Sequence, residues 1–173
     1  PEVRRIYLSA TLPSRRSFLR AFGRRPSAIV SPEGKTNAAQ RVFVLPSSQT
    51  LPERRQFALS VVENKRCAIL VPSFRHAKEW ESHGECLPQG SGKAVLLNFS
   101  NSQNGRLILV ARYDGVDLPG DLCRALIVDG LPKAEQLFES LMVGVLQLNQ
   151  ERERRIADRL VQGLDRLFRR NRD

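Results

Sequence analysis

The 173-residue sequence is poor in the residues that build metal and disulfide sites. It contains two histidines and three cysteines. His83 and Cys86 stand three positions apart, which would suit a metal-binding pair, but the sequence offers no second pair to complete a tetrahedral site. The cysteines are odd in number and far apart, so no disulfide framework is indicated. We therefore expect no metal bound by this chain alone, and we expect Cys67 and Cys123, which begin apolar runs, to lie in the core.

Long apolar runs and aromatic residues are scarce as well. No segment approaches the roughly 18 apolar residues of a membrane span, and the opening PEVRRIYLSATL lacks the apolar core and cleavage site of a signal peptide. We expect a cytoplasmic or nucleoid-associated protein, without membrane contact, and an excised piece of a longer chain because it begins at Pro1. Aromatic residues make up 6%, and with Trp80 and Tyr113 isolated no stacking platform for bases is evident.

Positive charge is abundant by contrast. Lys and Arg number 28 against 18 Asp and Glu, a formal net charge of +10. Most of these cations are arginines, clustered at Arg4, Arg5, Arg15, Arg16, Arg20, Arg24 and Arg25, and again at Arg152, Arg154, Arg155, Arg159, Arg166, Arg169, Arg170 and Arg172. Guanidinium groups suit bidentate phosphate contacts, so the composition favours a polyanionic partner. A solvated basic surface without a partner accounts for the same composition.

Short apolar runs rich in β-branched residues alternate with helical patterns. Strands are predicted at 5–9, 28–30, 41–45, 67–71, 94–97, 107–110 and 125–129. Helices are predicted at 12–23, 51–65, 73–84 and over most of 133–170. The alternation predicts an α/β fold, with a mostly parallel sheet flanked by helices on both sides, in one domain over 1–173. Ligands of such folds bind beyond the carboxyl ends of the strands, where the polar loop ARYDGVDLPGDLCR (111–124) is expected.

Two segments resemble the end of a phosphate-binding P-loop without completing it. SPEGKT (31–36) has Ile29 where the leading glycine is required. QGSGKA (89–94) has Leu87 at that place, and Ala94 replaces the Ser or Thr that would bind magnesium. We interpret both as glycine-containing turns. The alternative that the chain is a small P-loop kinase depends on these two segments alone.

Four stretches carry a more specific pattern, in the order SAT (9–11), LVPSFR (70–75), YDGVDLPGD (113–121) and QGLDRLFR (162–169). They resemble motifs III, IV, V and VI of superfamily 2 helicases, most closely the DinG/XPD-like branch. Motif V of that branch reads as an acidic residue, G-[IV]-D-x-P-G-D, then a strand and G-L-P, which residues 114–121 and 123–132 match. Motif VI, Q-x-x-G-R-x-x-R, is matched except that Asp165 replaces its glycine.

The resemblance implies a RecA-like three-layer sandwich, the second motor domain of an ATP-dependent helicase or translocase. It implies a nucleic-acid partner, with DNA favoured over RNA. ATP and Mg²⁺ would be bound mainly by a preceding N-terminal RecA-like domain of the same protein, and the isolated chain is expected to be inactive for lack of a P-loop. Arg166 and Arg169 are the implied arginine fingers, which stabilise charge on the transferred phosphoryl group. Gln162 would orient nucleotide or water.

The remaining implied contacts lie in the other three motifs. Gly115 and Asp117 would form the motif V contact to the nucleotide. Nucleic-acid contacts and coupling to the ATP cleft are implied for Ser73, Arg75, Ser9 and Thr11.

Ordinary structural roles remain open for the same residues. Asp117 and its neighbouring carboxylates also suit a turn, and Ser73 also suits a helix cap. The stretch 162–169 also fits a basic amphipathic helix with a solvated face. Asp165 is a departure that predicts slower ATP turnover, and it favours the alternative of a degenerate domain that binds nucleic acid or protein without turnover.

Overall fold

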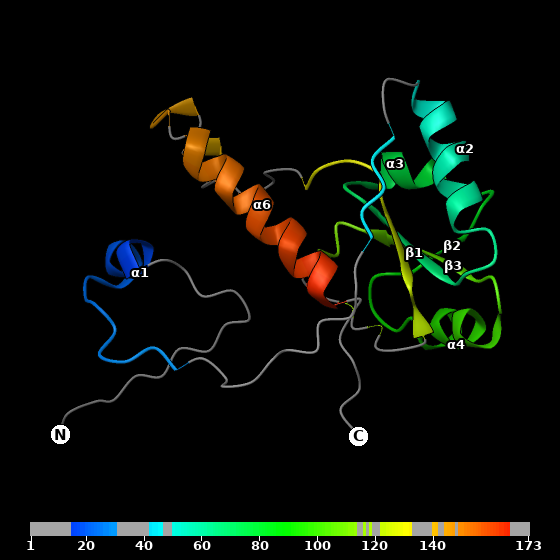
Figure 1. Ribbon diagram of the computed structural model, residues 1–173, viewed down its shortest axis with the longest axis horizontal. Coiled ribbons are helices and arrows are strands. Elements are labelled where there is room, and N and C mark those ends of the chain that lie inside the picture. Colours follow the sequence, from blue (N-terminus) through cyan, green and yellow to red (C-terminus); the bar gives the residue numbers. More distant parts are fainter. Residues whose placement is uncertain are drawn as a thin grey trace. The chain divides into compact units, whose positions relative to one another are not determined.

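Figure 1 shows the fold of the chain in a computed structural model. The structure describes residues 15–30, 42–46, 50–113, 116, 118, 122–132, 140–141, 144–147 and 149–166. The chain divides into two compact units, Pro1–Val42 and Phe43–Asp173. The sequence had suggested one domain over the whole length, and the larger unit carries the sheet.

The smaller unit contains helix α1, Arg15–Phe22. Its Phe18 and Phe22 rings pack together with centroids 4.6 Å apart. Gly23 ends the helix as predicted: its φ is +68°, which glycine adopts without strain, and its N–H donates to the Leu19 carbonyl at 2.8 Å. Residues 28–30, expected to form a strand, are exposed and form none.

The larger unit is built on a four-stranded, all-parallel sheet. Its strands are β1 (Cys67–Val71), β2 (Glu85–Cys86), β3 (Arg106–Val110) and β4 (Ala125–Val128), in the order β2-β3-β1-β4. Strand β1 is central, with Cys67 aligned to Arg106 of β3 and to Ala125 of β4. The continuous apolar runs that predicted β1, β3 and β4 arise because a parallel sheet is covered on both faces.

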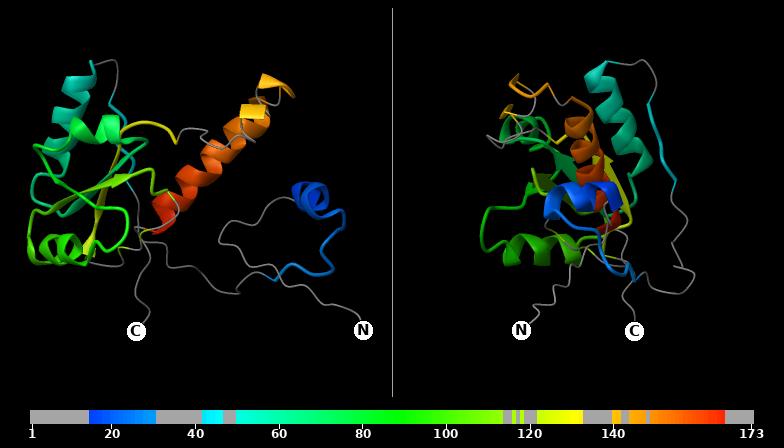
Figure 2. Two further views of the ribbon diagram at one scale, coloured as in Figure 1. Left: turned by 180° about the vertical axis from the view of Figure 1, so that it is seen from behind. Right: turned by 90° about the vertical axis from the view of Figure 1, so that its left-hand side faces the viewer.

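Helices cover each face of this sheet (Figures 1 and 2). Successive side chains along β1 and β3 point to opposite faces of the sheet, and each face has its own apolar cluster. Helices α2 (Leu51–Val61) and α3 (Phe74–Lys78) pack on the face formed by Cys67, Ile69, Val71, Ile108 and Val110. Helix α4 (Lys93–Asn101) packs on the face formed by Ala68, Leu70, Leu107 and Leu109, and α6 (Asn149–Arg166) reaches this face only with its carboxyl-terminal part, through Leu160 and Gly163. The predicted α/β fold with a parallel sheet between helices is therefore confirmed.

Some predicted elements were wrong. Residues 94–97 belong to α4, where Val95, Leu96 and Phe99 face the core at helical spacing; four apolar residues alone do not distinguish a strand from a helix. Residues 42–45 form no strand and are exposed. Helix α3 ends at Lys78 rather than continuing to residue 84, and the two-residue strand β2 was not foreseen.

Within the described ranges, no helix combines the length and the apolar character needed to cross a lipid bilayer.

Candidate functional site at the carboxyl edge of the sheet

The carboxyl ends of β1, β3 and β4 lie next to one another. The Ala111 N–H, just beyond β3, donates to the Val71 carbonyl at 2.8 Å. The Asp129 N–H, just beyond β4, donates to the Leu70 carbonyl at 3.0 Å. The segments that leave β3 and β4 therefore begin on either side of the end of β1, where open parallel sheets bind their ligands.

The loop after β3 is anchored by apolar side chains in spite of its polar sequence. Leu118 is 1% exposed, and Val116 and Leu122 pack on the α4 face of the core. Because β3 and β4 lie on opposite sides of β1, this loop crosses the sheet to reach β4. Val116, Leu118 and Leu122 thus anchor the loop to the core, and the polar residues of the loop alternate with these anchors in the sequence.

The backbone at the start of this loop is strained. Ala111 has a φ of +51°, a left-handed conformation that a residue with a Cβ rarely adopts. Tyr113, two residues later, is buried, and its hydroxyl donates to the Gly130 carbonyl at 3.3 Å. Burial, and secondarily the negative charge of Asp129, raises the pKa of Tyr113 to about 12. Strain held in place by buried neighbours is a feature that functional loops share.

Helix α6 meets the same loop. A Cβ placed on Gly163 would lie 3.4 Å from both the Leu70 Cδ2 and the Tyr113 carbonyl oxygen. Leu160, one turn earlier, packs against the core on the α4 face. The stretch that resembles motif VI is thus in contact with the first residue of the stretch that resembles motif V, and Gln162, half-buried, lies beside that contact.

A polar cluster that the sequence did not predict fixes the other side of this edge. The carboxylate of Asp129 accepts hydrogen bonds from the Trp80 Nε1 at 2.8 Å and from the Arg55 Nε at 3.0 Å. Arg55 also pairs with Glu79 at 3.2 Å. The cluster therefore ties α2 and the turn after α3 to the end of β4. The one available signal was the aspartate directly after a buried strand, since its partners lie 49 and 74 residues away.

The segment that resembles motif IV is described in full. Ser73 is the N-cap residue of α3 by its backbone, but its hydroxyl makes no capping bond and instead lies 2.9 Å from the His76 Nδ1. Arg75 is exposed on α3. Ser73 therefore keeps its side chain in a local pair at the carboxyl edge, and Arg75 is accessible to a large partner.

The other predicted site residues lie wholly or partly outside the described part of the chain. Ser9, Thr11, Gly115, Asp117 and Arg169 are outside it altogether. Arg166 is the last residue of α6, and its side chain is also outside it. Their roles remain predictions.

The second P-loop-like segment and the cysteines have structural places. Gly92 is the N-cap residue of α4 and Gly90 has a φ of +107°, so this stretch is a glycine-containing turn that enters a helix. Cys67 and Cys123 are buried as expected. Burial is the main cause that raises the pKa of the Cys67 thiol to about 12, and it also raises the pKa values of Cys86 and Cys123. Within the described ranges no three His, Cys, Asp or Glu side chains gather as they would around a metal ion.

Comparisons with known proteins add no relative. No protein-family model matches the chain, and no curated protein or solved structure is significantly similar to it.

Proposed function

We propose that this chain is the C-terminal motor domain of an ATP-dependent nucleic-acid helicase or translocase, with DNA favoured over RNA. Its carboxyl edge would form one wall of an ATP cleft, and a preceding RecA-like domain would supply the P-loop and most of the contacts to ATP and Mg²⁺. The isolated chain would bind no ATP productively.

The observation that carries this proposal is the close approach of Gly163 to Leu70 and Tyr113, such that an added Cβ would lie 3.4 Å from each. In a two-domain motor, the arginines of the last motif must stand beside the loop that contacts the nucleotide. Gln162 and Arg166 flank Gly163 in α6, and Tyr113 directly precedes Asp114 and Gly115 in the sequence. Two stretches that are about fifty residues apart are therefore brought to one edge of a parallel sheet, where nucleotides bind in such folds.

Residue roles follow the motif positions. Arg166 and Arg169 would approach the transferred phosphoryl group, and Gln162 would orient the nucleotide or a water molecule. The Gly115 backbone and the Asp117 carboxylate would contact the nucleotide from the loop after β3, since glycine permits a close approach of the main chain. Ser73 and Arg75 would contact the nucleic-acid backbone, a contact that positions the strand without reading its sequence.

Asp165 supports a second candidate, a degenerate motor domain that binds nucleic acid or protein without turnover. A carboxylate beside Arg166 would either hold the guanidinium or repel the γ-phosphate. ATP turnover by the wild-type polypeptide separates the candidates, and an Asp165→Gly variant tests the effect of the carboxylate: in a working motor that Asp165 slows, turnover rises in the variant. If turnover is unchanged, the slowing effect is refuted.

The finger assignment is tested in the complete polypeptide that joins these residues to the preceding domain. An Arg166→Ala/Arg169→Ala variant is compared with Arg154→Ala, which removes an exposed arginine of the same helix. Loss of a finger is expected to lower kcat by ~10³–10⁵, with KM changed much less. Equal kcat values for the two variants would refute the assignment.

A further inference from the structure

Helix α6 separates its charges by face. At about 100° per residue, Arg152, Arg155 and Arg159 fall within one arc of about 60° along the helix. We call these three arginines the basic arc. The acidic residues Glu151, Glu153 and Asp158 fall outside this arc. Arg154 also lies outside, about 130° from the middle of the arc.

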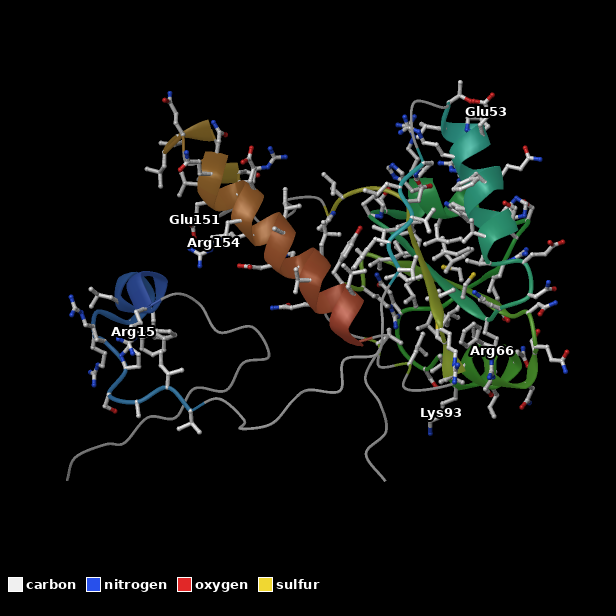
Figure 3. The ribbon with its side chains drawn as sticks, in the orientation of Figure 1. Arg15, Glu53, Arg66, Lys93, Glu151 and Arg154 are labelled. Atoms are coloured by element: carbon white, nitrogen blue, oxygen red, sulfur yellow. The ribbon has the colours of Figure 1, made fainter. Side chains whose placement is uncertain are left out.

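The contacts of α6 fix how this arc faces the core. Leu160 and Gly163 lie on the side that faces the sheet, because Leu160 packs against the core cluster and a Cβ on Gly163 would meet Leu70. Within the arc, Arg155 and Arg159 are half-buried and Arg152, nearer the start of the helix, is exposed; Arg154, outside the arc, is exposed as well. Figure 3 shows Arg154 and Glu151 on the amino-terminal half of the helix. The basic arc therefore runs along one flank of α6 and ends at Arg159, about one turn before Gly163 reaches the carboxyl edge of the sheet.

We propose that the basic arc binds the phosphate backbone of a single-stranded nucleic acid. Side chains three and four residues apart on a helix are neighbours, with Cβ atoms about 5–6 Å apart, so the arc forms a continuous row of guanidinium groups. Guanidinium binds phosphate oxygens in bidentate geometry, and a row of such groups matches a linear polyanion better than a single small anion. This partner rests on the proposed function and adds a contact surface on α6 to it.

The composition of the arc favours nucleic acid over an acidic protein. All three residues of the arc are arginines, and the exposed apolar residues Ala157 and Val161 of this helix lie outside it. Protein interfaces depend on buried apolar or aromatic anchors at their centre. Contacts to a phosphate backbone require only charge and hydrogen-bond donors.

Neighbouring arginines provide a matched test. Binding of a fluorescein-labelled oligothymidylate to the 173-residue chain is followed by fluorescence anisotropy at several salt concentrations, without ATP. For Arg155→Ala, the slope of log K against log salt is expected to fall by about 0.7, which corresponds to about fivefold weaker binding near 0.1 M salt. For the double variant Arg155→Ala/Arg159→Ala, the slope is expected to change by twice as much as for Arg155→Ala alone. Arg154→Ala removes the same charge one residue away and is expected to leave most of the slope intact.

Further measurements exclude trivial causes. Arg155→Lys keeps the charge and is expected to retain most of the slope. Urea unfolding, followed by the fluorescence of Trp80, checks that each variant is folded. Equal effects of Arg154→Ala and Arg155→Ala, or no binding by the wild type, would overturn the proposal. It is also overturned if polyglutamate displaces the probe as well as unlabelled oligothymidylate does. Because no ATP is used, these outcomes are independent of whether the longer polypeptide hydrolyses ATP.

Discussion

Replacement of Asp129 by alanine is expected to destabilise the larger unit strongly. The Asp129 carboxylate accepts one hydrogen bond from Trp80 and one from Arg55. Trp80 is completely buried, so its indole N–H would lose its partner without gaining water. Arg55 retains Glu79 as a partner and is about one-fifth exposed, so it loses less.

The magnitude follows from these environments. An unsatisfied buried donor costs about 1–3 kcal/mol, and loss of a charge-assisted bond adds about 1 kcal/mol for a partly exposed arginine. We expect Asp129→Ala to lower the free energy of unfolding by about 3 kcal/mol in total. For a unit of this size that corresponds to a fall in Tm of roughly 10 °C. Asp129→Asn keeps an acceptor for Trp80, so a smaller loss is expected.

The assay uses the chain's own reporter. Trp80 is the single tryptophan, so its fluorescence during urea unfolding reports on the packing that the variant disturbs. Glu79→Ala is the matched control, because it removes the other carboxylate bonded to Arg55 from a site that is 60% exposed. Exposed ion pairs contribute about 0–1 kcal/mol, so this control should change stability little. If Asp129→Ala is no more destabilising than Glu79→Ala, the argument from the buried Trp80 donor is wrong.

Three further predictions concern packing and titration. Gly163→Ala should stabilise the chain by up to about 1 kcal/mol through helix propensity, since the new Cβ would make ordinary contacts at 3.4 Å. Gly84→Ala should destabilise it, because the Cβ would lie 2.8 Å from a β3 carbonyl oxygen; the reverse order of urea midpoints would contradict both. Near pH 8, a thiol reagent should modify the half-buried Cys86 before the buried Cys67, and equal rates in the folded protein would refute this. Stability should fall between about pH 9 and 12, because folding raises the pKa values of Cys67 and Tyr113 to about 12 and the unfolded chain releases these protons first. Tyr113→Phe should reduce this alkaline loss, and a urea midpoint independent of pH would contradict the linkage.

The sheet was largely predictable because its central strands, β1 and β3, are buried on both faces. Residues 67–71, 107–110 and 125–129 are short apolar runs, and the structure places a strand in each of them. The run at 94–97 was misassigned because four apolar residues fit either period, and only the facing core shows that they lie on a helix. Strand β2 has two residues and carries no periodic signal.

The candidate site was predictable in its location but not in its supporting contacts. The loop 111–124 was expected at the carboxyl edge because it follows an apolar strand. Its first residue, Ala111, lies there, whereas Cys123 and Arg124 precede β4 at the amino edge of the sheet. The Asp129 cluster was missed because it depends on long-range packing: Arg55, Trp80 and Asp129 come from three separate elements. Local patterns identify which residues end a strand. Their hydrogen-bond partners depend on how the helices pack on the sheet, which a local pattern does not contain.

The central claim is that this chain is half of an ATP-driven motor, and ATP hydrolysis tests it most directly. Turnover would be measured in the complete polypeptide with and without single-stranded DNA, beside the isolated 173-residue chain. We predict turnover that DNA stimulates in the complete polypeptide and none in the isolated chain. Nucleic acid bound without any ATP turnover in the complete polypeptide would contradict the motor and favour the degenerate binding domain.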